Sequence, residues 1–193
     1  MSKRIALLTA AAFGGLALTA AVFAPVNAQD KMKSEMSGEK TVMVGGAAMF
    51  PSKNIVQNAV NSKDHTTLVA AVKAAGLVDT LESKGPFTVF APTNAAFAAL
   101  PAGTVDTLLK PENKPALTKV LTYHVIPGKL EASSLTDGKK LKTVEGEELT
   151  VKRSGDTVMI VDAKGGSSTV TIPNVNQSNG VIHVVDTVLM PAS

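Results

Sequence analysis

The stretch GPFTVFAPTNAAFAAL, at residues 85–100, constrains the fold of this chain more than any other segment. It begins as a short apolar run, from Phe87 to Phe90, with the aromatic and β-branched residues typical of a buried strand. Pro92 breaks this run, and Thr93 is suited to cap a helix. The apolar positions that follow, such as Phe97, fit one face of that helix. The sequence therefore predicts a strand that turns directly into a short amphipathic helix.

The rest of the chain reads as helices first and strands second. Apolar residues repeat at helical spacing over residues 55–60, 68–75 and 117–121, and Gly76 is placed to end the second of these helices in a left-handed turn. After Pro127 the apolar residues alternate as they do in strands. This order, without β-α-β alternation, predicts an α+β fold in which the strand at residues 87–90 returns to pair within the later sheet.

Two further segments carry a family resemblance. They are Tyr123-His124-Val-Ile-Pro127 and the run NGVIHVVDTVLMP, from Asn179 to Pro191. Together with residues 85–100, and in this order, they resemble the signature segments of fasciclin-like domains. The resemblance covers roughly residues 50–191. It implies a twisted β-sandwich or wedge flanked by several short helices, and it implies adhesion as the function of some members.

The start of the chain has the pattern of a bacterial export signal. Lys3 and Arg4 precede an apolar run over residues 5–23, and Ala28 supplies a small residue just before a cleavage point. A membrane anchor is the alternative, because the run approaches the length that spans a bilayer. The alanine-rich composition favours cleavage, so we expect an exported protein, periplasmic or extracellular, with no membrane span in the mature chain. The expected organisation is a signal peptide at residues 1–28, a flexible linker at 29–49 and a single fasciclin-like domain at 50–191.

The charge balance excludes one class of partner. The whole chain has 19 basic and 16 acidic residues, but Lys3 and Arg4 belong to the leader, which leaves 17 basic residues against 16 acidic ones. Arg153 is the only arginine after the leader. Nucleic-acid binding needs a basic face and arginine side chains for the phosphates. We therefore predict no nucleic-acid partner.

Neither catalysis nor a cofactor is predicted. The chain has no cysteine and lacks the Gly-x-Ser-x-Gly, Ser-x-x-Lys and His-Glu-x-x-His motifs. Its histidines, His65, His124 and His183, do not form the close pairs common in metal sites. The prediction is a non-enzymatic protein with no catalytic residue, cofactor or metal. An ester-cleaving enzyme is the least favoured alternative.

Tyr123 and His124 are the first candidate site residues, at the junction of a predicted helix and a predicted strand. Both side chains can donate and accept hydrogen bonds. The resemblance associates this pair with domain stability and, in some members, with adhesion. The residues themselves favour a structural role, because buried polar groups need hydrogen-bond partners. His183, inside a β-branched run, is interpreted in the same way.

Asn174 and Val175 are the second candidate, in the expected loop over residues 172–180. In some animal fasciclin domains the matching positions carry an Asp-Ile pair linked to integrin binding, and here the carboxylate is missing. We expect adhesion to a protein or to a cell-surface or matrix component, through this loop and the loop at 128–137. The alternative is a carrier of a small apolar ligand such as a carotenoid. The absence of tryptophan and the single tyrosine disfavour a sugar-stacking groove.

Overall fold

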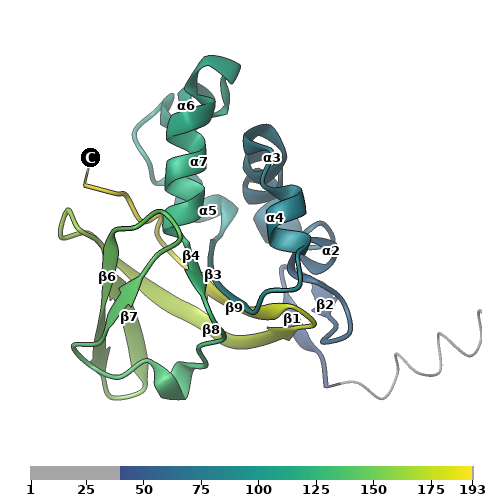
Figure 1. Ribbon diagram of the computed structural model, residues 1–193, viewed down its shortest axis with the longest axis vertical. Helices are drawn as coiled ribbons and strands as arrows, with labels where there is room; N and C mark the ends of the chain where they lie inside the picture. The colour runs from purple at the N-terminus through teal and green to yellow at the C-terminus, as the bar shows by residue number, and fades with distance from the viewer. Residues whose placement is uncertain (1–39, 193) are drawn as a thin grey trace, which may run out of the picture.

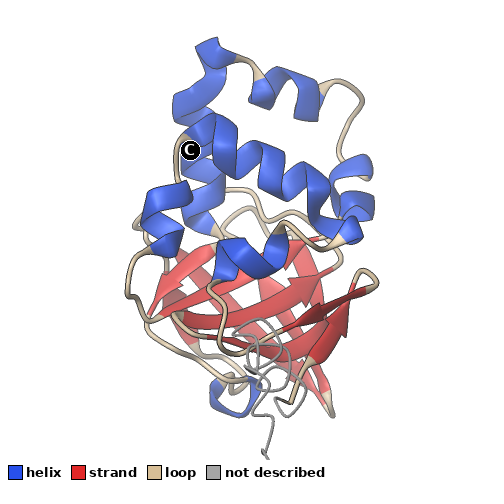
Figure 2. Ribbon diagram, turned by 90° about the vertical axis from the view of Figure 1, so that its right-hand side faces the viewer, coloured by secondary structure: helices blue, strands red, loops and turns tan. Residues whose placement is uncertain are grey.

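The computed structural model describes residues 40–192, so the predicted signal peptide and most of the predicted linker lie outside the described residues. The described part has two layers. Short helices gather on one side, and a strongly curved β-sheet forms the other (Figures 1 and 2). This arrangement confirms the predicted α+β fold.

The large sheet has seven strands in the order β4-β3-β9-β8-β7-β6-β5. Their bounds are β3 Phe87–Pro92, β4 Val125–Pro127, β5 Lys140–Lys142, β6 Glu148–Ser154, β7 Thr157–Val161, β8 Ser167–Gln177 and β9 Gly180–Val185. β3 pairs in parallel with β9 and antiparallel with β4, so the early strand does return into the later sheet, as predicted. The N–H of Val144, just after β5, donates to the carbonyl of Val125 in β4 at 2.8 Å. This bond joins the two ends of the sheet, which is therefore nearly closed.

The helices begin and end where local chemistry places them. Their bounds are α2 Ile55–Ala59, α3 Thr66–Ala75, α4 Val78–Glu82, α5 Asn94–Ala98, α6 Thr104–Leu109 and α7 Lys114–Tyr123, with 3₁₀ turns η1 Lys63–His65, η2 Pro111–Asn113 and η3 Ala132–Ser134. Gly76 ends α3 with a φ of 73°, the left-handed turn that the sequence predicts. Thr93 caps α5, as predicted, because its hydroxyl accepts a hydrogen bond from the N–H of Ala96. Among the described residues, no helix is long and apolar enough to cross a membrane.

The folded part begins earlier than the sequence suggests. Strands β1 (Val42–Val44) and β2 (Ala47–Met49) form an antiparallel hairpin inside the range that was expected to be a linker. Val44 and Met49 are each only 3% exposed and belong to the core beneath the helices. The expected boundary at residue 50 places these two core residues in the linker. Strands of three residues are too short to show a clear alternating pattern.

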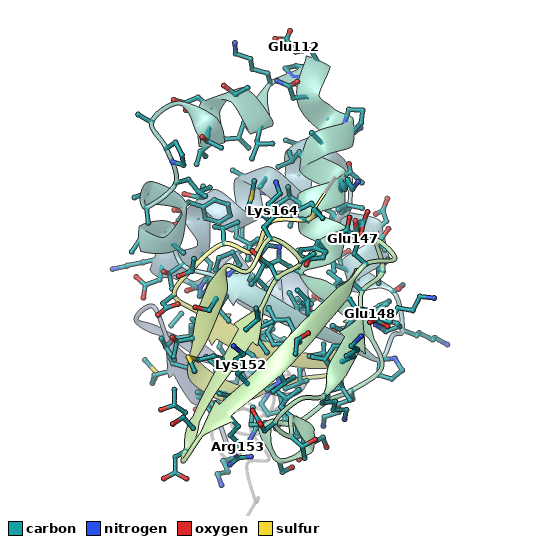
Figure 3. All side chains as sticks on the ribbon, turned by 90° about the vertical axis from the view of Figure 1, so that its left-hand side faces the viewer. Glu112, Glu147, Glu148, Lys152, Arg153 and Lys164 are labelled. Atoms are coloured by element: carbon teal, nitrogen blue, oxygen red, sulfur yellow. The ribbon has the colours of Figure 1, made fainter. Side chains whose placement is uncertain are left out.

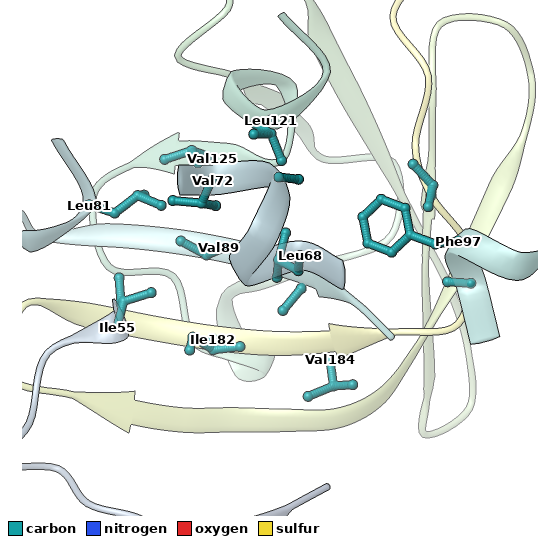
Figure 4. Close-up of a cluster of buried hydrophobic side chains, with 14 of the residues drawn as sticks. Ile55, Leu68, Val72, Leu81, Val89, Phe97, Leu121, Val125, Ile182 and Val184 are labelled. Atoms are coloured by element: carbon teal, nitrogen blue, oxygen red, sulfur yellow. The ribbon is translucent and has the colours of Figure 1, made fainter. Parts of the chain in front are cut away.

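Strand β3 separates two hydrophobic cores. Successive side chains of a strand point to opposite faces, so Val89 packs against the helices while Phe90 packs inside the curved sheet. Figure 4 shows the first core, in which residues of α3 and α7 meet residues of β3 and β9. The second core fills the nearly closed sheet and contains Leu149, Val151 and Ile160, each fully buried. Because both faces of β3 are buried, its sequence is apolar apart from Thr88, whose hydroxyl donates to the carbonyl of Gly128.

Gly180 begins β9 where no side chain fits. A β-carbon at this position would collide with the backbone carbonyl of Phe87, its partner in β3. Glycine therefore permits the close approach of β3 and β9 at the first pair of their parallel ladder.

Candidate functional site

Tyr123 ends α7 and places its ring inside the second core. The side chain is fully buried. Its hydroxyl accepts a hydrogen bond from the N–H of Ala163, in the turn between β7 and β8, at 2.9 Å. Burial raises the pKa of the phenol, so the hydroxyl stays neutral. Tyr123 therefore joins the end of a helix to a distant turn of the sheet.

His124 follows directly and is 2% exposed. Its Nδ1–H donates to the carbonyl of Val120 at 2.8 Å, and its Nε2 accepts a hydrogen bond from the N–H of Leu189 at 3.0 Å. Burial lowers the pKa of the imidazole to about 4, although the Val120 carbonyl and the Asp162 carboxylate both act to raise it. A neutral ring with both nitrogens engaged is suited to holding the C-terminal segment in place.

Asp162 reinforces this junction from the other side. Its Oδ2 accepts from the N–H of Met190 at 3.1 Å. Its Oδ1 accepts from the N–H groups of Lys164 and Gly166, at 3.0 and 2.7 Å. The turn that Tyr123 contacts is thus tied to the segment that His124 contacts. The sequence prediction did not include Asp162, although aspartate before a Gly-Gly turn is a common turn signal.

His183 lies in β9 and is fully buried against Phe90, with the ring centroids 5.7 Å apart. Its Nε2–H donates to the carbonyl of Leu130 at 2.8 Å, and its Nδ1 accepts from the N–H of Asn174 at 3.3 Å. Burial lowers its pKa below the ordinary value. His183 therefore positions two segments that the sequence analysis proposed as partner-binding loops.

The structure corrects the expected position of Asn174 and Val175. Both lie within β8, which pairs with β9 as far as Gln177, and not in a loop over residues 172–180. Val175 is 1% exposed and packs in the first core, so it cannot contact a partner. Two register shifts between Val170 and Val175 interrupt the alternation of side chains, so the sequence here lacks the pattern that predicts a strand.

Asn174 connects the two segments that were expected to bind a partner. It is half-buried and has a φ of 56°, a left-handed conformation that asparagine tolerates better than most residues. Its Oδ1 accepts from the N–H of Ala132, in η3, at 2.7 Å. The segment over residues 128–137 is thereby held against β8.

His65 is the third buried histidine, 2% exposed. Its Nδ1 contacts the hydroxyl of Ser62 at 2.9 Å, while its Nε2 has no hydrogen-bond partner among the described residues. Burial lowers the pKa of His65. The nearby carbonyl of Ala91 acts to raise it, although this carbonyl does not meet the geometry of a hydrogen bond to the ring. His65 lines an apolar cavity of about 50 Å³ between helices and sheet. Because its lining is almost entirely apolar, a cavity of this kind stays dry.

A second, polar cleft of about 260 Å³ lies where η3, the β6–β7 turn and the middle of β8 meet. It is lined by Ala132, Arg153, Asp156, Thr157, Val158, Thr169, Val170, Thr171 and Pro173. Figure 3 shows Arg153 at the end of β6, far from Glu112 and the helical layer. The sequence analysis did not connect these residues, because they come together only through strand pairing.

The described residues contain no group of three or more histidine, aspartate or glutamate side chains that could hold a metal ion. The histidines also stand in separate surroundings. His124 bonds to Val120 and Leu189, His183 to Leu130 and Asn174, and His65 to Ser62. These separate hydrogen bonds suit the histidines to holding segments of the fold together. The cleft around Arg153 is where polar groups meet solvent.

Comparison with known proteins gives consistent matches over most of the described part. The model of the fasciclin domain matches residues 63–191. Protein sll1483 of Synechocystis is 50% identical over 153 residues, which cover 79% of this chain and 82% of that protein. Immunogenic protein MPB70 of Mycobacterium bovis is 34% identical over 199 residues, with 99% and 98% covered. Cell surface glycolipoprotein MPB83 of the same species is 39% identical over 153 residues, with 77% and 64% covered.

A solved structure shows the same fold. It is the FAS1 domain pair from the insect cell adhesion molecule Fasciclin I, which superimposes with a TM-score of 0.66 at 17% identity. The match covers 73% of this chain and 52% of that structure. At this identity the likeness concerns the fold.

Proposed function

Because this chain belongs to the fasciclin domain family, we propose that it is an exported, non-enzymatic binding module that mediates adhesion at the cell surface or in the extracellular matrix. In this proposal residues 1–28 are removed on export, to the periplasm or beyond. A linker then precedes the domain, which begins with the β1–β2 hairpin. The partner is a protein or another component of the cell surface or matrix.

The observation that carries this proposal is the cleft. The Oδ1 of Asn174 accepts a hydrogen bond from the N–H of Ala132 at 2.7 Å. This bond holds the segment over residues 128–137 against β8, at the edge of the polar cleft of about 260 Å³. Exposed segments on a rigid scaffold are the usual place for recognition. The rigid scaffold here is the nearly closed sheet, with one core inside it and one between it and the helices.

Two similar proteins support the choice of adhesion. Fasciclin I is named as a cell adhesion molecule and MPB83 as a cell surface glycolipoprotein. Their names describe those proteins, and we extend them to this chain only as part of the proposal.

The state of the histidines supports a non-enzymatic role. A general base must reach a substrate proton and have a pKa near the working pH. His124 and His183 are buried, and both nitrogens of each ring bond to backbone groups. These rings are therefore poor candidates for the ester-cleaving alternative.

The cavity beside His65 bears on the apolar-ligand alternative. Its volume of about 50 Å³ is well below the roughly 150 Å³ of an engineered cavity that binds benzene. A carotenoid is far larger than benzene. The cavity beside His65 therefore gives no support to the carrier role.

Attachment assays test the proposed function. Deleting the gene should reduce attachment of the source cells to a surface or to one another, and the wild-type gene should restore it. A secreted copy supplied from outside should also restore attachment, because the proposed role is extracellular. Unchanged attachment of the deletion strain across several surfaces and growth conditions would count against the proposal.

A further inference from the structure

We propose that the polar cleft binds an extended peptide segment of a partner protein, which adds as a short strand along the edge of β8. This inference rests on the proposed function, because it specifies the chemistry of the adhesive partner. The partner contributes backbone hydrogen bonds, and its side chains alternate between an apolar and a polar face.

The cleft begins where two strands separate. The ladder between β7 and β8 runs from Val161 and Ser167 to Met159 and Thr169, where it ends. Both strands continue beyond that pair, β7 to Thr157 and β8 to Gln177. The residues that would extend the ladder, Thr157 and Val158 on one side and Val170 and Thr171 on the other, line the cleft.

Two strand edges therefore border the same space. Beyond the ladder, β7 is paired with β6 on its other side, where Arg153 lies opposite Val158. β8 is likewise paired with β9 on its other side, where Val170 lies opposite Val185. The backbone N–H and C=O groups of a strand lie in the plane of the sheet. Those on the unpaired sides point towards the cleft and can bond to an added strand.

The edge accepts only a short segment. At one end Ala132 bonds to the side chain of Asn174, and Pro173 has no N–H to donate. The register shifts in β8 also bend the edge here. The volume of about 260 Å³ is below the range of about 300–1,000 Å³ for pockets that enclose a whole small ligand. These features suit a few residues of a longer polypeptide.

The side chains around the cleft define the peptide's pattern. Val158 and Val170 face the core inside the sheet, so an added residue that points inward should be small and apolar. Thr157 and Thr171 are exposed, so its neighbours should be polar. Alternation along β6 places Arg153 on the same side as Val151, at the mouth of the closed sheet.

Arg153 adds a charge preference. Its Nε donates to the carbonyl of Gly155 at 3.1 Å, and no carboxylate among the described residues forms an ion pair with its guanidinium. Asp156 also lines the cleft and would repel an acidic side chain that lies near it. An acidic side chain of the peptide is therefore favoured only on the Arg153 side, where it can bond to the remaining guanidinium N–H groups, a strong type of hydrogen bond. None of the described residues that line the cleft is aromatic, so stacking of a sugar ring has no support there.

Binding of a labelled peptide to the mature protein tests the inference. The probe is a short fluorescent peptide in which valine alternates with threonine or glutamate, measured by fluorescence polarisation. Its matched control has the same sequence with alternate backbone amides methylated. We expect the probe to bind and the methylated peptide to lose binding, since an added strand depends on backbone hydrogen bonds.

Matched variants locate the binding. Arg153→Ala should weaken binding of the probe about tenfold, equivalent to about 1.4 kcal/mol. Lys152→Ala should leave it unchanged, because Lys152 is an exposed neighbour on the opposite face of β6. The Arg153→Glu variant should bind a probe in which lysine replaces glutamate more tightly than it binds the original probe. The melting temperature of each variant confirms that it is folded.

Each outcome decides a different point. Equal binding of the methylated peptide, or equal loss in Arg153→Ala and Lys152→Ala, would overturn the inference. If the probe fails to bind while the protein still restores attachment, the inference is overturned and the adhesive role stands. The same holds if an acidic oligosaccharide, an oligogalacturonide, binds in place of the peptide. Peptide binding by a protein that has no effect on attachment would instead support the cleft and overturn the proposed function.

Discussion

The hydroxyl of Tyr123 accepts a hydrogen bond from the N–H of Ala163, 40 positions along the chain. The next residue, His124, accepts one from Leu189. Adjacent side chains at the end of α7 thus hold both the turn between β7 and β8 and the C-terminal segment. This arrangement accounts for a tyrosine-histidine pair at a helix-to-strand junction without any direct contact with a partner.

Tyr123→Phe tests the first of these bonds. The substitution keeps the aromatic ring in the core and removes only the acceptor for Ala163. We expect the free energy of unfolding to fall by about 1 kcal/mol, the usual net value of one hydrogen bond. Urea denaturation measures the change, and Tyr123→Ala, which also leaves a cavity, should lose about 3–5 kcal/mol. Unchanged stability together with a loss of attachment would show that Tyr123 acts in binding.

The buried histidines predict a loss of stability in mild acid. The pKa of His124 is 6.5 in the unfolded chain and about 4 in the folded protein. The contribution of the neutral His124 to the free energy of unfolding is complete above pH 6.5. This contribution is lost as the pH falls towards 4, because only the unfolded state takes up the proton. The lowered pKa values of His65 and His183 act in the same direction.

His124→Gln isolates the contribution of this residue. The difference between the pKa of His124 in the unfolded and folded states corresponds to a loss of about 3 kcal/mol in the free energy of unfolding between pH 6.5 and 4. The variant should be less stable than the wild type at neutral pH, and its stability should fall less steeply over this interval. Urea midpoints measured across the pH range give both slopes. Parallel curves for the two proteins would contradict the assignment of the pH effect to His124.

Local signals made parts of this fold predictable. The strand at residues 87–90, the cap at Thr93 and the left-handed turn at Gly76 depend on neighbouring residues, and all of them are present. The sequence predicts an exposed loop at Val175, which is wrong because the irregular pairing of β8 hides the alternation of a strand. The cleft around Arg153 was not predicted, because the divergence of β7 and β8 depends on pairing between distant strands.

Asn179 should be among the most sensitive polar positions. It is 6% exposed, and its Oδ1 accepts from the N–H of Ile55 at the start of α2. Its Nδ2 donates to the carbonyls of Leu81 and Ser83, at the end of α4. Asn179→Ala removes all three bonds, of which those to Ile55 and Leu81 are buried. We expect a loss of about 3 kcal/mol in the free energy of unfolding.

A nearby asparagine provides the control for this prediction. Within residues 40–192, the Oδ1 of Asn176 is buried and has no hydrogen-bond partner, and its Nδ2 makes one long bond, of 3.4 Å, to the carbonyl of Asn174. Asn176→Ala should therefore change the free energy of unfolding by less than about 1 kcal/mol. Thermal and urea denaturation of both variants compare the two amides directly. Equal losses would show that the bonds of Asn179 to the helices do not determine stability.

Removal of the β1–β2 hairpin tests where the domain begins. A chain that starts at Phe50 loses Val44 and Met49, which are each 3% exposed and pack in the first core. Burying such a side chain contributes about 1.5–3 kcal/mol, so the truncated chain should be less stable by on the order of 4 kcal/mol than one that starts at Lys40. Met43→Ser, at a position on β1 that is 60% exposed, should stay within about 0.5 kcal/mol of the wild type. Equal stability of the two truncated chains would show instead that the hairpin contributes nothing and that the domain begins at residue 50.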